Sequence, residues 1–454
     1  MGREIEELAQ FVAATRWQDV PPPVQHHTKL VLLDTLGVML AGSERPEVRE
    51  LRDRLVSPCG RGATVYARGW PLCDPRLAAL LNGIAGRAIE LCEGLRLASG
   101  QAAVQILPGL LALGEHLGSS GRELLAAFVL GYEVAARLAE GFTPRERAHQ
   151  NGQVSLLAAA AAGARLYGLD GAGISRAMRI ATVLLLTPSY RNAIAGATAL
   201  NVAGGASGLV ATLAPELALA GFTAQEEAIE EALGQLVGAG FTTAGLTEAL
   251  GRRWGITRNY FRLHACCNPI HPALDCLAEI LAELRPQPGE IARIEIATYR
   301  FAALMNSPDP PNYFAAKYSL PHAAATMVVR GHAGFAALDD SALSDPAIAA
   351  LRRRVEVVED AAMSALVPRL RPARVTVRLG DGRQSTRSRD SHRGDFEHPF
   401  TAAELRAKFR ELAGTVLTGE GAAAVAEAID HSEEWPNLAV LTALLRRHEN
   451  AEKP

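Results

Sequence analysis

The chain has 454 residues, enough for two domains with hydrophobic cores of their own. Charged residues make up 21% of it and the formal net charge is -3, which gives no reason to expect nucleic acid or an anionic membrane as a partner. The six cysteines form no CxxC pair and no zinc-finger spacing with histidine, so we expect neither a disulfide framework nor a metal centre. The N-terminus is acidic and amphipathic rather than signal-like, and we expect a cytoplasmic protein that crosses no membrane.

Helical periodicity dominates the chain up to about residue 260. Two apolar helical patterns flank a polar insert at 90–105, and a capping box at 120–123 begins a long helix. A helix of small residues is predicted from Asn201 to Leu219. Two shorter helices are predicted on either side of it, from Ser175 to about Leu186 and from Gln225 to Leu233.

The pattern changes after about residue 265. Apolar and polar residues alternate around Ile294 and again around Val355, which predicts two strands. A third predicted strand ends in Gly380-Asp381-Gly382, a hairpin turn signal that is followed by the polar segment QSTRSR. A second capping box at 401–404 returns the chain to helix.

These elements predict a mainly α protein with two domains. Residues 1–264 and 401–454 are expected to form a large all-helical domain, and residues 265–400 a smaller α+β domain with a small antiparallel sheet. A cleft between two such domains is a common place for a small-molecule site.

Two polar stretches in the helical part are candidates for chemistry. Glu93, Arg96 and Gln101 lie in the insert between two apolar helices, which is either a solvated loop or the wall of a pocket. His149 and Asn151 lie just before a buried helix, where exposed amides could bind an anion and the imidazole could act as acid or base. The alternative for this second stretch is an N-terminal capping loop.

Of two further polar stretches, one crosses the predicted domain boundary and the other lies in the predicted α+β part. The segment RLHACCNPIH contains Arg262, which can bind a carboxylate through two hydrogen bonds, together with Cys267 and His271. It is either a functional segment or a surface loop with incidental histidines. Lys317 and Ser319 in KYSLPH offer an amine and a hydroxyl. Because no nucleophile–base pair has a recognisable spacing, the four stretches best suit proton chemistry next to a carboxylate.

Six blocks in order along nearly the whole chain resemble the MmgE/PrpD family. They are LVLLDTLGVMLAG, ILPGLLALGEHLGSSGRELLAAFVLGYEVAARL, AAAAAGARLYGLD, NYFRLHACCNPIHPALD, FAAKYSLPHAAA and HPFTAAELRAKFRELAG. The resemblance implies an all-helical domain with a smaller α+β domain, usually in a homodimer. It also implies cofactor-free lyase or isomerase chemistry on small polycarboxylates, as in dehydratase, decarboxylase and epimerase members.

The resemblance also implies which positions keep the family's residues and which do not. Kept are Glu93, Gly94, Arg96, His149, Gly152, Cys267 and His271. Replaced, mostly from ionisable or amide residues, are Cys92, Leu95, Ser99, Gln101, Asn151, Val154, Leu200 and Arg262. Each lost charge-assisted hydrogen bond removes about 1.5–3 kcal/mol, so we expect a substrate less highly charged than the family's tricarboxylates.

We therefore expect a cofactor-free isomerase, epimerase or lyase that acts on a small carboxylate and uses no metal. His149 is the expected acid or base, Arg262 the carboxylate clamp, and Glu93 with Arg96 a positioning pair. The other candidates are His271 and Cys267 for catalysis and Gln101, Asn151, Lys317 and Ser319 for substrate binding. Two alternatives stay open: an inactive paralogue that acts as a binding or partner protein, and a pocket adapted to a larger hydrophobic biosynthetic substrate.

Overall fold

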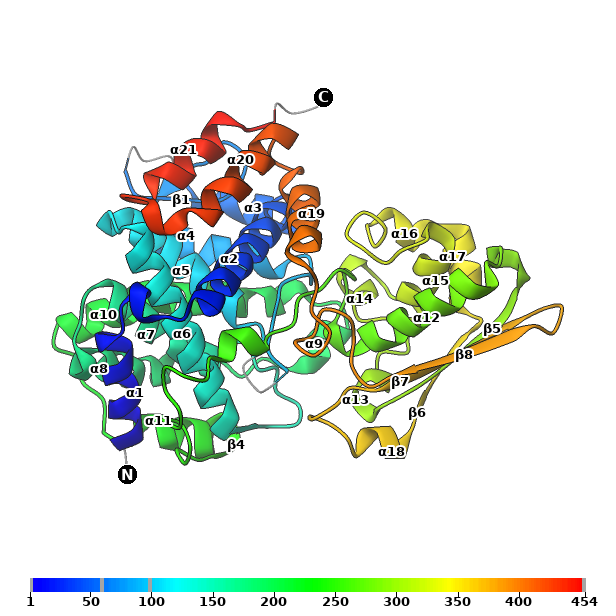
Figure 1. The fold of residues 1–454 in the computed structure, drawn as a ribbon, viewed down its shortest axis with the longest axis horizontal. Coiled ribbons are helices and arrows are strands. Elements are labelled where there is room, and N and C mark those ends of the chain that lie inside the picture. Colours follow the sequence, from blue (N-terminus) through cyan, green and yellow to red (C-terminus); the bar gives the residue numbers. More distant parts are fainter. Residues whose placement is uncertain (1–2, 58–60, 97–99, 451–454) are drawn as a thin grey trace. The chain divides into compact units, whose positions relative to one another are not determined.

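The structure is a computed structural model that describes residues 3–57, 61–96 and 100–450 (Figure 1). The chain divides into two compact units. The first, here called the helical unit, comprises Met1–Ser189, Ala199–Asn259 and Thr401–Pro454. The second, here called the α+β unit, comprises Tyr190–Thr198 and Tyr260–Phe400.

The helical unit is a bundle whose last helices return to its first ones, since α19 packs against α2 (Figure 1). Its helices are α1 (Arg3–Ala14), α2 (Pro22–Ser43), α3 (Pro46–Leu55), α4 (Pro75–Arg87), α5 (Ala102–Leu117), α6 (Gly121–Gly141), α7 (Val154–Leu166), α8 (Gly171–Ala181), α10 (Val202–Leu219), α11 (Ala228–Glu231), α19 (Ala402–Ala413), α20 (Gly419–Asp430) and α21 (Ala439–Arg447). Two short antiparallel pairs join them, β1 (Ala63–Thr64) with β2 (Leu72–Cys73) and β3 (Phe142–Pro144) with β4 (Gly238–Phe241).

Small residues let α10 pack backbone against backbone with α4 and α5. A Cβ atom on Gly205 would lie 2.4 Å from the carbonyl oxygen of Leu80 in α4. A Cβ atom on Gly109 in α5 would lie 2.5 Å from the carbonyl oxygen of Gly208 in α10. The sequence is rich in alanine and glycine at these helices because only small side chains permit this approach.

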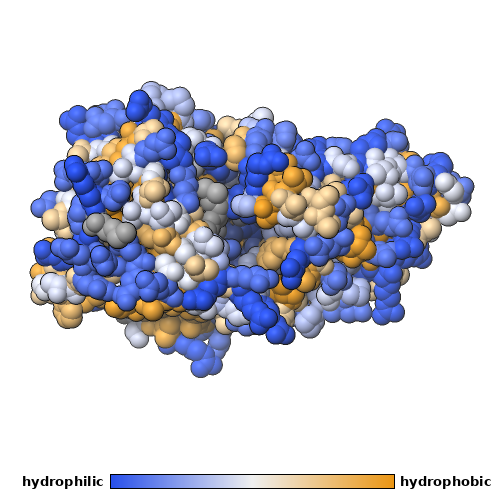
Figure 2. All heavy atoms as spheres, turned by 90° about the horizontal axis from the view of Figure 1, so that it is seen from below, coloured by the Kyte–Doolittle hydropathy of each residue, from blue (hydrophilic) through white to orange (hydrophobic). Residues whose placement is uncertain are grey.

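The segment Thr198–Leu219 is long and apolar enough to cross a membrane by length and composition alone. In the structure 61% of its apolar 18-residue window is buried, and α10 packs against α4, α5 and α7 as a core helix does. On the face shown in Figure 2, hydrophilic and apolar side chains are interspersed.

The α+β unit contains a four-stranded sheet with helices on one face. Its strands β5 (Ile291–Thr298), β6 (Val355–Glu359), β7 (Ala373–Leu379) and β8 (Gln384–Arg389) lie in the order β6-β5-β7-β8. Its helices are α9 (Tyr190–Ile194), α12 (His271–Leu284), α13 (Arg300–Ala303), α14 (Tyr313–Ala316), α15 (Leu320–Arg330), α16 (Ser341–Ser344), α17 (Pro346–Arg352) and α18 (Ala361–Ser364). Helix α12 packs against β7 and β8, and α15 against β6.

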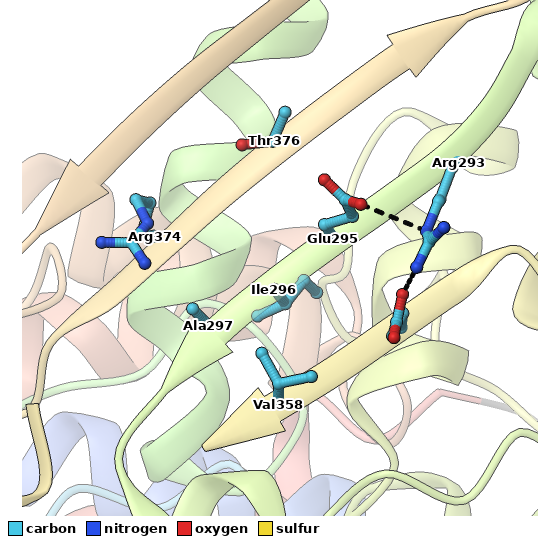
Figure 3. A pocket seen from close by; sticks show the side chains of 8 residues that line it. Arg293, Glu295, Ile296, Ala297, Val358, Arg374 and Thr376 are labelled. Atoms are coloured by element: carbon cyan, nitrogen blue, oxygen red, sulfur yellow. Dashed lines mark ion pairs between the residues drawn. The ribbon is translucent and has the colours of Figure 1, made fainter. Parts of the chain in front are cut away.

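A depression of about 280 Å³ on the sheet is lined by β5, β6 and β7 (Figure 3). Arg293 points across it and pairs with Glu295 at 3.3 Å and with Glu356 on β6. All three side chains are about one-third to one-half exposed, so their charges remain largely hydrated.

The mainly α fold with a small sheet is confirmed, but the sheet is mixed rather than antiparallel. Strands β5 and β7, and β7 and β8, pair antiparallel, whereas β6 runs parallel to β5. The reason is the long helical connection from β5 to β6, which carries the chain back to the end of the sheet where β5 began. Alternation of apolar residues identifies a strand but not its direction.

Both predicted capping boxes are confirmed: Ser120 with Glu123 begins α6, and Thr401 with Glu404 begins α19. Two predicted helix ranges are wrong. The helix placed at 175–186 is α8, which starts at Gly171 behind an Asp170 cap and ends at Ala181. The helix placed at 225–233 is α11, which continues into a π-helical turn as far as Leu236.

Candidate functional site

Glu93 lies between α4 and α5 with its side chain fully buried. Its carboxyl group accepts hydrogen bonds from the Tyr132 hydroxyl at 2.7 Å, the Ala103 backbone amide at 2.9 Å and the Asn259 side-chain amide at 3.2 Å. Ala103 is in the first turn of α5, so Glu93 supplies an acceptor that a helix start lacks. Burial raises the pKa of Glu93 to about 7 despite these donors. Its described hydrogen bonds go to neutral groups and do not include Arg96.

A histidine extends this chain of hydrogen bonds. His27 Nε2 lies 2.8 Å from the Asn259 side-chain oxygen, and the Asn259 amide nitrogen donates to Glu93. Because the Asn259 oxygen can only accept, His27 carries its proton on Nε2. Burial lowers the pKa of His27, which keeps the ring neutral.

A second group of buried polar residues, here called the amide cluster, comprises Gln101, Gln105, Asn151, Gly152, Gln153 and Ser207. Gln105, on α5, is its centre. The Gln105 oxygen accepts from the Gly152 backbone amide at 2.7 Å and from the Ser207 hydroxyl at 3.2 Å. The Gln105 nitrogen donates to the Gln101 carbonyl at 2.8 Å and to the Asn151 side-chain oxygen at 3.4 Å. The cluster therefore joins the start of α5, the turn before α7 and the first third of α10.

His149 lies beside this cluster and is buried. Its Nδ1 atom accepts the backbone N–H of Asn151 at 3.1 Å, and its own backbone N–H donates to Pro188 at 2.8 Å. An accepting Nδ1 places the proton of the neutral ring on Nε2. The segment 149–153 leads into α7 and is buried except at the half-buried Gln150, and among the described residues Gln153 at the N-cap position makes no side-chain cap.

Arg262 is fully buried in the α+β unit. Its guanidinium donates to the Cys266 carbonyl oxygen at 3.2 Å and lies 5.6 Å from the centre of the Tyr260 ring. His271 Nε2 donates to the same carbonyl at 3.0 Å, which leaves Nδ1 as the accepting nitrogen. The Cys267 sulfur lies 3.6 Å from the Tyr190 hydroxyl.

Three imidazole rings lie side by side next to Arg262. The ring centres of His264 and His271 are 5.2 Å apart, and those of His271 and His392 are 5.1 Å apart. Burial lowers the pKa of His271 well below its usual range and that of His392 to about 4. His264, at one end, pairs with Asp275 at 3.0 Å. The Arg262 guanidinium therefore supplies a fixed positive charge beside His271, whose own ring is neutral at neutral pH.

His392 is held by its own hydrogen bonds. Asn268 donates to His392 Nε2 at 2.6 Å, His392 Nδ1 donates to the Arg393 carbonyl at 2.8 Å, and Arg371 donates to the Asn268 oxygen. This arrangement fixes the tautomer of the ring.

Lys317 and Ser319 are buried and bonded within the same unit. The Lys317 ammonium donates to the Leu338 carbonyl at 2.6 Å and lies 4.3 Å from the centre of the Tyr313 ring. The Ser319 hydroxyl donates to Ser307 at 2.6 Å and caps α15 by accepting the His322 amide at 3.0 Å. These contacts give both side chains a structural role.

The predicted site residues divide evenly between the two units. The helical unit holds Glu93, Arg96, Gln101, His149 and Asn151, and the α+β unit holds Arg262, Cys267, His271, Lys317 and Ser319. All but Arg96 are buried, so a solvated loop is wrong for Glu93 and Gln101, and a surface loop is wrong for Arg262 and His271. Ser99, one of the replaced positions, lies outside the described residues.

No pattern in the sequence singles out His27, Tyr132, Asn259 or His392, which complete these networks. Their partners lie far away in the chain, as with Asn259 and Glu93, which are 166 residues apart. The available signal was a polar side chain inside an apolar helix, as at Tyr132 in α6.

Comparison with known proteins places these residues in a family. The MmgE/PrpD N-terminal domain matches residues 6–242, and the MmgE/PrpD C-terminal domain matches residues 264–434. The chain belongs to the MmgE/PrpD family.

Curated relatives match almost from end to end at low identity. The cis-aconitate decarboxylase-like protein oryM of Aspergillus oryzae is 26% identical, over 98% of this chain and 97% of its own. The cis-aconitate decarboxylases of Mus musculus and Homo sapiens are 23% and 24% identical, over 97% of this chain and 93% and 94% of their own.

Proposed function

We propose that this protein is a cofactor-free enzyme that moves a proton at a carbon next to a carboxylate of a small acid. Membership of the MmgE/PrpD family and the decarboxylase relatives support an enzyme of general lyase type. Isomerisation or epimerisation is the favoured outcome, because it needs only removal and return of the proton. Elimination also needs an acid for the leaving hydroxide.

The observation that carries this proposal is the fixed protonation of two buried imidazoles. His149 is neutral with its proton on Nε2, because Nδ1 accepts the Asn151 amide. His271 is neutral with Nδ1 as the acceptor, because Nε2 donates to Cys266. His149 is therefore suited to donate a hydrogen bond to a developing enolate oxygen, and His271 to accept a proton.

Arg262 is the proposed carboxylate-binding residue. Its guanidinium can bind a carboxylate through two hydrogen bonds and stays charged in a buried place, where an ammonium group would tend to lose its proton. It cannot act as the base for the same reason. Glu93 is a positioning residue, because its hydrogen bonds tie the start of α5 to Tyr132 and Asn259.

The test is solvent deuterium exchange into a panel of small unsaturated and hydroxy acids, followed by NMR with the purified chain. His149→Ala is expected to slow exchange by about 10²–10⁴-fold, the usual contribution of acid–base catalysis. Arg262→Ala is expected to raise KM more than it lowers kcat, and Arg262→Lys to restore part of the loss. Arg378→Ala, about half-exposed on the sheet, is the control and is expected to change neither.

Unchanged exchange in both His149→Ala and Arg262→Ala would overturn these assignments. Lack of exchange by the unaltered chain, with no thermal stabilisation by any acid, would favour an inactive paralogue. We further propose that the protein is a cytoplasmic homodimer, which light scattering of the purified chain and fractionation of cells would test.

A further inference from the structure

The amide cluster has a defined orientation. The backbone N–H of Gly152 can only donate, so the Gln105 atom that faces it is the oxygen. The other end of the Gln105 amide is then the nitrogen, and the Asn151 atom facing that nitrogen must be an oxygen. The remaining atom of the Asn151 amide is therefore its nitrogen, a donor of two hydrogen bonds.

Two amide side chains of the cluster have unused hydrogen-bonding capacity. Among the described residues, the Asn151 side-chain nitrogen has no hydrogen-bond partner, and neither has the oxygen or the nitrogen of the Gln153 side chain. Both residues are fully buried. A buried polar atom without a partner costs about 1–3 kcal/mol, so these three atoms favour a ligand that completes them.

The chemistry of these atoms specifies the ligand group. Asn151 needs an acceptor, and Gln153 needs both a donor and an acceptor. A carboxylate offers only acceptors and would place a negative charge against the Gln153 oxygen. A primary carboxamide offers a carbonyl oxygen and an N–H side by side, and it carries no charge into a cluster whose hydrogen bonds join neutral groups.

We propose that the amide cluster binds a carboxamide, so that the substrate is a small acid with one carboxylate and one carboxamide. The carboxylate part of this inference rests on the proposed function, and the carboxamide part rests on the cluster alone. Gln101, Gln105 and Ser207 act as positioning groups, and Asn151 and Gln153 contact the ligand.

Three probes of nearly equal shape separate the possibilities: succinamate, levulinate and succinate. They end in a carboxamide, a methyl ketone and a second carboxylate, respectively. By isothermal titration calorimetry, the full-length chain is expected to bind succinamate about tenfold or more tightly than either of the others. Levulinate keeps the acceptor for Asn151 and lacks the donor for Gln153, so it isolates the contribution of Gln153.

Gln153→Met removes both amide atoms at similar volume and is expected to abolish the preference for succinamate over levulinate. Asn151→Asp replaces the donor with an acceptor and is expected to weaken both of these probes. Since either variant can fail to fold, the ranking of the three probes on the unaltered chain is the primary result. Gln18→Met, an exposed position of the same unit, is the matched control and should leave the ranking unchanged.

Succinate binding as tightly as succinamate would overturn the proposal and indicate that water completes the cluster. Failure of all three probes to bind at about 10 mM would also overturn it. The proposed function has its own test, which it fails if no acid exchanges deuterium. If a dicarboxylate exchanges deuterium but succinamate binds weakly, the carboxamide proposal is rejected and the proposed function stands.

Discussion

Burial shifts the pKa values of polar groups in opposite directions in the helical unit and in the α+β unit. In the helical unit, burial favours the protonated, neutral form of Glu93. In the α+β unit, burial favours the deprotonated, neutral form of His271 and His392. Both effects arise because a low dielectric disfavours charge, whichever sign it has. The guanidinium of arginine keeps its charge when buried, so Arg262 differs in kind from the neutral imidazoles beside it.

The largest effect is expected at Glu93, whose raised pKa makes the free energy of unfolding depend on pH. Its pKa rises from 4.5 to about 7 on folding, so its contribution is fully present below about pH 4.5 and is lost as pH rises through 7. The free energy of unfolding of Glu93→Gln, relative to that of the unaltered chain, should rise by roughly 2–3 kcal/mol from pH 5 to pH 8, at 1.36 kcal/mol per pKa unit. Urea denaturation at both pH values measures this. Glu420→Gln, an exposed counterpart, should show no such gain.

His392 should make the free energy of unfolding change with pH in the opposite direction. Its pKa falls from 6.5 to about 4 on folding, so its contribution is present above about pH 6.5 and is lost as pH falls through 4. Between pH 7 and pH 4.5, His392→Phe should lose roughly 2 kcal/mol less stability than the unaltered chain. Thermal melts across this range, with His398→Phe as the exposed control, check the difference. Equal acid lability of His392→Phe and the unaltered chain would contradict the neutral ring.

A smaller change in stability is expected at Gly205, where backbone packing and not charge sets the free energy of unfolding. Gly205→Ala would place a methyl group 2.4 Å from the Leu80 carbonyl, so α10 must shift away from α4. We expect a loss of at least about 1 kcal/mol in the free energy of unfolding. Gly419→Ala, where no atom lies within 4 Å of the added methyl, is the matched control and should be neutral.

The smallest change in stability is expected from a substitution on the open face of the sheet (Figure 3). Arg293 is half-exposed and pairs with Glu295 and Glu356, which are about one-third and one-half exposed. Such pairs contribute little because water screens them, so Arg293→Ala should change the free energy of unfolding by less than about 1 kcal/mol. The change should fade further in 1 M salt, where charges are screened within about 3 Å. A loss above that limit would show that buried and exposed charges differ less than proposed.

Local patterns predicted much of the fold. The capping boxes at Ser120 and Thr401 and the strands β5 to β8 could be predicted because each depends on a few neighbouring residues. The pair β3 and β4 could not, because Gly238–Phe241 has no alternation of large apolar and polar residues. The direction of β6 depends on the connection rather than on the strand itself.

For the site, the sequence predicted which residues matter but not their protonation. Polar residues between apolar helices drew attention to Glu93 and His149, and the family resemblance supported them. Which nitrogen of His149 carries the proton depends on the Asn151 amide, and the pKa of Glu93 depends on its burial. Those are properties of the folded chain, and no spacing in the sequence encodes them.

The close approach of α10 to α4 and α5 has a consequence for how such a site can evolve. Ser207 lies between Gly205 and Gly208, and Gln105 lies one helical turn before Gly109, so backbone atoms set where both side chains stand. Their positions do not depend on which side chains occupy neighbouring polar sites. A chain built in this way can exchange an ionisable residue for an amide and acquire a different ligand while its scaffold stays unaltered.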